Sequence, residues 1–133
     1  MPSDQLTAVD LFCGGGGFST GLALACEELE RDARLIAINH WTKAIETHKR
    51  NHPGAEHHNA KVEELHPPAI VGDDDVDILV AGPECTHFST ARGGKPVNEQ
   101  KRASPWHVVD WIQQTPPDAV LVEVRDDDGL DVA

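Results

Sequence analysis

The chain has 133 residues, which suits one modest domain and is too short for two domains of ordinary size. Its 23 acidic residues outnumber 11 Lys and Arg, and the formal charge of −12 argues against a free-standing nucleic-acid-binding protein, because neutralising phosphates requires clustered basic side chains. Such acidity also suits a protein that works in high salt, where repulsion between carboxylates is screened.

The first predicted elements are a strand and a helix joined by glycines. The apolar run from Leu6 to Phe12 predicts a strand, and the four consecutive glycines after Cys13 mark a tight turn into a helix over Phe18 to Leu29. The apolar side of this helix consists of Leu22, Leu24, Ala25 and Leu29.

The same alternation continues along the chain. The next predicted elements are a strand (Leu35 to Ile38), a helix (Trp41 to Arg50), a weak strand (Glu56 to His58), a loop (Glu63 to Asp75), a buried strand (Val76 to Ala81), a polar loop (Glu84 to Arg102), a helix from Ser104 that stops at Pro116, and a last strand (Ala119 to Val124). Strands alternating with helices predict an α/β fold: a mostly parallel sheet of about five strands with helices on both faces.

The rest of the sequence places few constraints on location. No apolar run reaches membrane-spanning length, and the N-terminus lacks the order of a signal peptide, so we expect a soluble, cytoplasmic protein. The 3 cysteines match no disulfide framework and no metal-binding pair, which predicts reduced thiols. We expect the acidic tail, residues 126–133, to be disordered.

The glycine-rich turn from Cys13 to Phe18 is the first candidate ligand site. Glycines between a parallel strand and a helix allow close approach of a ligand to backbone N–H groups. The turn does not match the dinucleotide fingerprint, since Ser19 or Thr20 stands where its third glycine would fall. Asn39 ends the next strand, where an acidic residue usually binds ribose hydroxyls, and an amide can still donate and accept hydrogen bonds.

A cysteine and a glutamate form the second candidate site. In a doubly wound sheet the first and fourth strands are adjacent, so the glycine turn should meet the loop that begins at Gly82. This loop carries Cys85, a candidate nucleophile, whereas Cys26 on the first helix is better explained as a small buried hydrophobic residue. The last strand delivers Glu123 to the same edge, where a carboxylate could move a proton.

Taken together, these motifs resemble those of the C5-cytosine DNA methyltransferases, over about Thr7 to Val124. The segment Asp10 to Gly21 is similar to the family's first motif, which surrounds the methionine moiety of S-adenosylmethionine. Cys85 to Ser89 resembles the catalytic loop, although Glu84 replaces its usual proline, and Glu123 to Arg125 resembles the Glu-Asn-Val motif without its Asn.

The resemblance implies a Rossmann-like S-adenosylmethionine-dependent methyltransferase half-domain, over residues 1–125, without a target recognition domain. Cys85 would attack C6 of a flipped-out cytosine and Glu123 would assist at N3, while C5 receives the methyl group. It implies no metal, and the 8 histidines form no coherent ligand set. The implied cofactor-binding residues are Asp10, Phe12, Gly14, Gly16, Gly17, Phe18, Asn39, His40 and Gly82.

Several alternatives remain open. The missing segments and the acidic charge suit a truncated or frame-shifted gene, with weak or no binding of double-stranded DNA by the chain alone. The chain could instead be an S-adenosylmethionine-binding module, or one half of a split enzyme whose C-terminal half is encoded separately. RNA remains a possible substrate. A nucleotide-dependent oxidoreductase is disfavoured because both the fingerprint and the acidic ribose residue are missing.

Overall fold

The computed structural model describes residues 5–83 and 104–123 and contains one five-stranded sheet. The strands are β1 (Leu6–Leu11), β2 (Ala33–Asn39), β3 (Glu56–Asn59), β4 (Ile78–Ala81) and β5 (Ala119–Val122). The helices are α1 (Gly17–Glu28), α2 (Thr42–Asn51), α3 (Pro67–Val71) and α5 (Ser104–Gln114), with a 3₁₀ turn η1 (Val62–Glu64) before α3.

All neighbouring strands are parallel, in the order β3-β2-β1-β4-β5. The central strand β1 pairs with β2 on one side and with β4 on the other, so the winding of the chain reverses at β1. This arrangement confirms the predicted doubly wound α/β fold. It also places the carboxyl ends of all five strands along one edge of the sheet, where such folds bind ligands.

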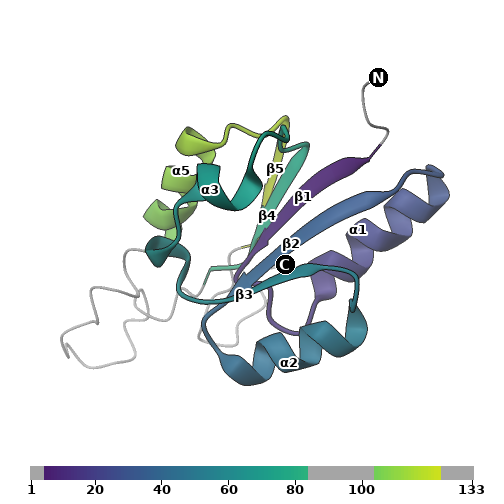
Figure 1. Cartoon of the computed structure of the whole chain (residues 1–133), viewed down its shortest axis with the longest axis horizontal. Helices are drawn as coiled ribbons and strands as arrows, with labels where there is room; N and C mark the ends of the chain where they lie inside the picture. Colours follow the sequence, from purple (N-terminus) through teal and green to yellow (C-terminus); the bar gives the residue numbers. More distant parts are fainter. Residues whose placement is uncertain (1–4, 84–103, 124–133) are drawn as a thin grey trace, which may run out of the picture.

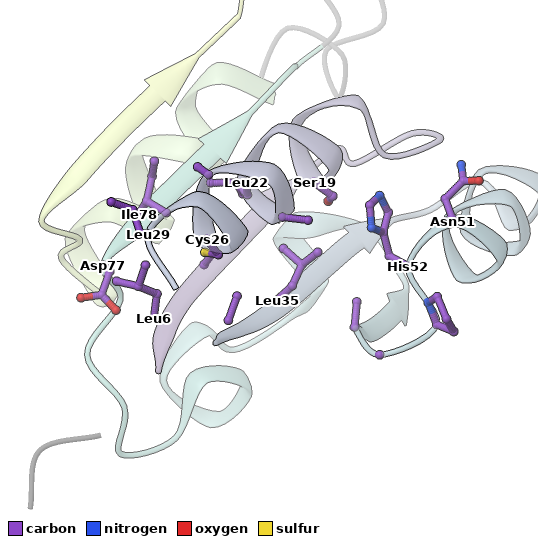
Figure 2. A pocket seen from close by; sticks show the side chains of 17 residues that line it. Leu6, Ser19, Leu22, Cys26, Leu29, Leu35, Asn51, His52, Asp77 and Ile78 are labelled. Atoms are coloured by element: carbon purple, nitrogen blue, oxygen red, sulfur yellow. The ribbon is translucent and has the colours of Figure 1, made fainter. Parts of the chain in front are cut away.

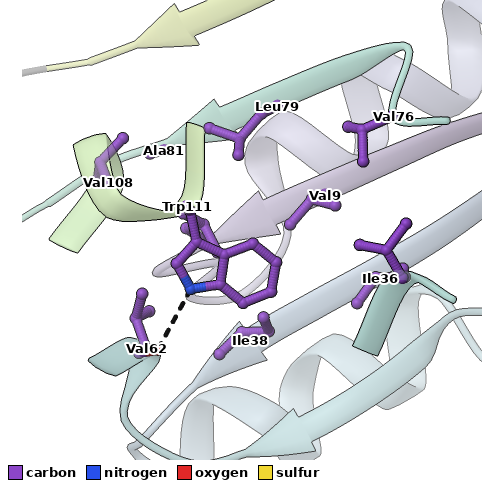
Figure 3. Packing of buried hydrophobic residues seen from close by; sticks show 11 residues of the cluster. Val9, Ile36, Ile38, Val62, Val76, Leu79, Ala81, Val108 and Trp111 are labelled. Carbon is purple, nitrogen blue, oxygen red and sulfur yellow. Dashed lines mark hydrogen bonds between the residues drawn. The ribbon is translucent and has the colours of Figure 1, made fainter. Parts of the chain in front are cut away.

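Helices cover both faces of the sheet (Figure 1): α1 and α2 lie on one side, and α3 and α5 lie on the other. The larger apolar core lies on the α3/α5 side, where alternate residues of the strands meet the helices. Trp111 of α5 is 1% exposed and its indole N–H donates to the backbone carbonyl of Val62 at 3.2 Å (Figure 3). This bond fixes α5 against the segment that follows β3.

The α1/α2 side is more polar and less completely filled. An apolar pocket of about 560 Å³ lies along α1 and the first residues of the strands beneath it (Figure 2). Only Ser19 and Cys26 of α1 are buried, whereas Leu24 and Leu29 are 60% and 63% exposed. The prediction of one apolar helix face was therefore wrong for these two leucines and for Ala25, which is also exposed, because Ser19 and Cys26 are the residues of α1 that face the sheet.

The segment from Glu63 to Asp75 also differs from expectation. It was predicted to be a loop, but it contains most of η1 and the whole of α3. Pro67 and Pro68 stand in the first turn of α3, where proline is favoured because those N–H groups have no helical partner. Prolines that indicated a loop in the sequence therefore begin a helix in the structure.

Smaller differences concern strand ends. Strand β2 begins at Ala33, earlier than predicted, and β4 begins at Ile78 rather than Val76. The predicted polar loop from Glu84 to Arg102 and the acidic tail lie outside the described residues. Within residues 5–83 and 104–123, no helix has the length and apolar character needed to cross a membrane.

Candidate functional site

Four of the predicted site residues lie side by side at the carboxyl edge of the sheet. The register aligns Ile38, Leu11, Ala81 and Val122 in one row across β2, β1, β4 and β5. The residues immediately after this row are Asn39, Phe12, Gly82 and Glu123. Segments that are more than 100 residues apart in the sequence therefore contribute to one edge, as the topology predicted.

The glycine turn occupies the centre of this edge and adopts an unusual backbone conformation. Phe12, Gly14 and Gly16 have φ values of 57°, 54° and 105°, all in the left-handed region. A bulky residue with such a φ is strained, and strain of this kind concentrates at functional sites. The turn is closed by a bond from the Gly16 N–H to the Cys13 carbonyl at 3.1 Å.

The turn leads directly into the N-terminus of α1. Gly16 is the N-cap and has no side chain to bond the first N–H groups of the helix. A Cβ atom placed on Gly14 or Gly17 would meet no atom within 4 Å, so open space lies in front of both residues. The N-terminus of a helix beside such open space suits a ligand that carries negative charge or carbonyl oxygen.

Side chains of α2 hold the turn from behind. Asn51 donates from its amide nitrogen to the Gly15 carbonyl at 2.8 Å, and His52 Nε2 lies 3.3 Å from the Gly16 carbonyl. On the other side, Phe18 approaches Gly82 closely, since a Cβ on Gly82 would lie 4.0 Å from the Phe18 ring. The glycine turn and the start of the β4 loop therefore meet, as the sequence predicted.

Beneath the turn lies a buried polar network that the sequence did not predict. Asp10 accepts a hydrogen bond from the Ser19 hydroxyl at 2.6 Å, and Ser19 Oγ lies 2.8 Å from His48 Nε2. His48 Nδ1 is in turn 2.7 Å from His57 Nε2. Asp10, Ser19 and His48 are all 0% exposed.

Burial shifts the titration of this network. Desolvation raises the pKa of Asp10 to about 6, against the lowering effect of its bond from Ser19. Desolvation and the neighbouring His57 and His52 lower the pKa of His48 to about 4. At neutral pH the network therefore contains one carboxylate and neutral imidazoles.

The adenosine side of the site has less specific support. Asn39 is half-buried at the end of β2, and its side-chain oxygen accepts the Trp41 N–H at 2.9 Å. His40 is exposed beside it. Both residues thus lie at the correct edge, but one acceptor of Asn39 is already used within the chain.

The cysteines differ in their surroundings. Cys13 and Cys26 are buried free thiols, and burial, together with the nearby Asp10, raises the pKa of Cys13 to about 12. A thiol held in its protonated form is a poor nucleophile. Cys85 lies outside the described residues, and Glu123, whose side chain is exposed, bonds the Ala81 carbonyl at 2.9 Å through its backbone N–H.

Sequence reasoning therefore identified the turn and the edge but missed the residues that support them: Ser19, His48, Asn51, His52 and His57. Only the spacing of His48 and His52, four residues apart on one helix, indicated that two of them share a face. In the part of the chain that the structure describes, no three His, Cys, Asp or Glu side chains are arranged to hold a metal ion.

Comparison with known proteins gives a consistent result. The family model for C-5 cytosine-specific DNA methylases matches residues 6–124. The Type II methyltransferase M.AgeI of Thalassovita gelatinovora is 30% identical over 123 residues, which cover 89% of this chain and 27% of that protein. The chain thus spans about a quarter of this relative's length.

Solved structures show the same likeness. One is assigned as a DNA modification methyltransferase encoded within a prophage (E. coli); it has 25% identity and a TM-score of 0.70, over 95% of this chain and 34% of that one. The DNMT2 mutant of Spodoptera frugiperda, with 22% identity, a TM-score of 0.65 and coverage of 96% and 38%, shares the fold. With a family model matched over nearly its whole length, the chain belongs to the C-5 cytosine-specific DNA methylase family.

Proposed function

We propose that the chain binds S-adenosylmethionine at the glycine turn and supplies the nucleophile for methylation of C5 of cytosine in DNA. The observation that carries this proposal is the shared edge of the sheet, where the register aligns the glycine turn, Gly82 and Glu123. Gly82 begins the segment that carries Cys85, three residues farther along the sequence, and Glu123 follows β5 in the same row.

The residues present fit this cofactor. Among the described residues, Asp10 Oδ1 is buried and has no hydrogen-bond partner, which suits a cationic ligand above it. The open space in front of Gly14 and Gly17 leaves room for the methionine end against the backbone. When bound, S-adenosylmethionine would supply an electrophilic methyl group. Phe12, Phe18, Asn39 and His40 would contact the remainder of the molecule.

In the proposed reaction, the Cys85 thiolate adds to C6 of a cytosine that has been flipped out of the duplex. The new S–C6 bond makes C5 nucleophilic, and Glu123 stabilises the adduct by sharing a proton with N3. C5 would then take the methyl group of S-adenosylmethionine, whose S–CH3 bond breaks to leave S-adenosylhomocysteine. A base removes the C5 proton, the electron pair re-forms the C5–C6 double bond, and the S–C6 bond breaks to release Cys85.

Binding is tested by calorimetric titration with S-adenosylhomocysteine. Gly17→Val fills the space in front of the turn without meeting protein atoms, and should weaken binding more than tenfold. Gly21→Ala, farther along α1, is the matched control and should leave the dissociation constant unchanged. Equal affinity for the parent and Gly17→Val would place the ligand elsewhere.

The nucleophile is tested by covalent trapping. An oligonucleotide containing 5-fluorocytosine should form a stable adduct with a protein in which the remaining segments of such an enzyme are present, and Cys85→Ser should abolish it. Cys26→Ser is the control, since Cys26 is buried in α1. Adducts that persist in Cys85→Ser would exclude this assignment.

A second candidate is one half of a split enzyme or a non-catalytic cofactor-binding module. It is favoured by strand β5, whose Val120, Leu121 and Val122 are 44%, 52% and 41% exposed, and by the net charge of −12, which offers DNA little attraction. Under the first proposal we also expect no turnover by the 133-residue chain alone. A methylation assay with labelled cofactor, with and without a complementing protein, separates the two: activity only on mixing indicates a split enzyme.

A further inference from the structure

A continuous hydrogen-bonded chain connects four elements beneath the glycine turn. It runs from Asp10 on β1 to Ser19 on α1, then to His48 on α2 and His57 on β3, through contacts of 2.6, 2.8 and 2.7 Å. Its first three members are fully buried, so water cannot replace a lost bond. Figure 2 shows Ser19 at the same end of the apolar pocket as His52.

Chemistry fixes the direction of these bonds when Asp10 is ionised. A carboxylate can only accept, so Ser19 must donate to Asp10 and accept from His48 Nε2–H. A neutral His48 that carries its proton on Nε2 must then accept at Nδ1 from the His57 Nε2–H. Each group therefore specifies the tautomer of the next.

The hydrogen-bonded series from Asp10 to His57 can take up one proton, either at Asp10 or at His57. The backbone carbonyls of Ala55 and His48 favour a proton on His57, which leaves the direction of the bonds unchanged. A proton on Oδ2 of Asp10 reverses all three bonds, whereas a proton on Oδ1, which has no partner among the described residues, leaves their direction unchanged; neither breaks a bond. Either uptake changes the net charge of the buried network from −1 to zero.

The charged and titratable groups around the chain oppose further protonation. Burial lowers the pKa of His57 most, and Lys49 of α2 and His52, which follows α2, lower it further. Burial and His57 lower the pKa of His48, and His52 adds to this effect. On the β1 side, the Cys13 thiol stays protonated and contributes no charge at neutral pH. Asp10 is therefore the principal charge of this interior.

We propose that His48 is a positioning residue for ligand binding at the glycine turn: through Ser19 it keeps the Asp10 carboxylate oriented and ionised, and the chain from Asp10 to His57 titrates as one unit that weakens binding in acid. This inference rests on the proposed function, because it assumes that a cationic group binds above Asp10. His48 itself touches no reacting atom.

The expected pH response follows from the Asp10 carboxyl, whose pKa is about 6. At pH 5 about one molecule in eleven retains the carboxylate, so the dissociation constant of S-adenosylhomocysteine should rise about tenfold between pH 7.5 and pH 5. The ammonium and carboxylate of the ligand's methionine end do not titrate between these pH values, so the ligand itself does not cause this change.

Titrations of four proteins test the proposal. His48→Phe keeps a ring but removes both nitrogens, and should weaken binding at pH 7.5 about three- to tenfold. It should also raise the pH at which the dissociation constant begins to increase in acid. His48→Gln restores a donor toward Ser19 and should recover the parent affinity at pH 7.5 within about twofold. His66→Asn changes an exposed histidine and should follow the parent at every pH.

Histidine ¹⁵N shifts provide an independent readout on the full chain. We expect His48 to be neutral with its proton on Nε2 at pH 7.5, and to stay neutral at pH 5. A proton on Nδ1 at pH 7.5, or a His48→Phe variant that binds with the parent's pH profile, overturns the inference alone. A parent that binds no S-adenosylhomocysteine at any pH overturns the proposed function, and the inference with it.

Discussion

Two adjacent glycines in the turn should respond oppositely to the same substitution. Gly16 has a φ of 105°, and a Cβ there would lie 2.8 Å from the Cδ2 atom of the His52 ring and 3.1 Å from that of His48. Gly17 is the first residue of α1, and its Cβ would meet nothing within 4 Å. Gly16→Ala and Gly17→Ala therefore add the same methyl group to neighbouring positions in contrasting surroundings.

The magnitudes follow from these contacts. At Gly16, an L-residue with this φ costs about 1–2 kcal/mol, and displacing the His52 ring endangers its bond to Thr20, which is worth about 0.5–1 kcal/mol. The reduced entropy of the unfolded chain offsets about 0.5 kcal/mol, which leaves a net loss of about 2 kcal/mol. At Gly17, alanine should stabilise the helix by about 0.5 kcal/mol.

Urea unfolding followed by circular dichroism measures both effects, with thermal unfolding as a second probe. Gly16→Ala should lower the midpoint temperature by about 6–10 °C, and Gly17→Ala should raise it slightly. If Gly16→Ala unfolds within 0.5 kcal/mol of the parent (on the order of the measurement error), the histidine ring is not a rigid wall of the turn. If Gly17→Ala is equally destabilised, the space in front of α1 is not open.

Three further predictions concern the core, the surface and pH. Trp111→Phe removes the indole N–H that donates to the Val62 carbonyl, along with part of a fully buried ring, and should cost about 2–4 kcal/mol in urea unfolding, whereas a loss below about 1 kcal/mol would refute the bond. Arg34→Met removes a guanidinium that holds the pKa of Glu56 below its usual range. The substitution should lower the free energy of unfolding by about 1 kcal/mol, and this loss should become smaller in high salt and as the pH falls below 4.5. A loss that depends on neither salt nor pH would contradict the ion pair. His48 takes up its proton at about pH 6.5 when unfolded but only near 4 when folded, so the contribution of His48 to stability should fall as the pH falls through this window, whereas Asp10, whose pKa burial raises to about 6, contributes with the opposite sign. His48→Gln should therefore lose less stability than the parent over the same titration.

The sequence was sufficient to predict that the first and fourth strands are adjacent, and at which edge of the sheet the candidate site should lie. Apolar runs bounded by glycine and proline identify strands such as β4, and the winding rule for parallel sheets then places Gly82 beside the glycine turn. The glycine turn itself could be predicted because four consecutive glycines destabilise the interior of a helix or a strand and favour a turn. These features depend on local composition and on a general topological rule, which a single sequence reveals.

The supporting residues could not be found in the same way. The contact between Ser19 and His48 depends on the rotation of α1 and α2 about their axes, which apolar periodicity does not fix when the inward residues are polar. The same ambiguity explains Leu24, which reads as a core residue but is exposed. Pro67 is another case, because proline is common both in loops and in the first turn of a helix.

The central position of β1 has a consequence for how the chain folds during synthesis. Ala8 is aligned with Leu35 of β2 on one side, but its partner on the other side, Ile78 of β4, is 70 residues away in the sequence. At about 5–20 residues per second, the ribosome needs about 2–8 seconds to pass from the end of β2 to the end of β4. During that interval one border of β1 is unpaired, and arrested nascent chains should become resistant to protease only once β4 has emerged. Strand β1, at the centre of the finished sheet, is thus synthesised before its neighbours β2 and β4 and gains its pairing with β4 late.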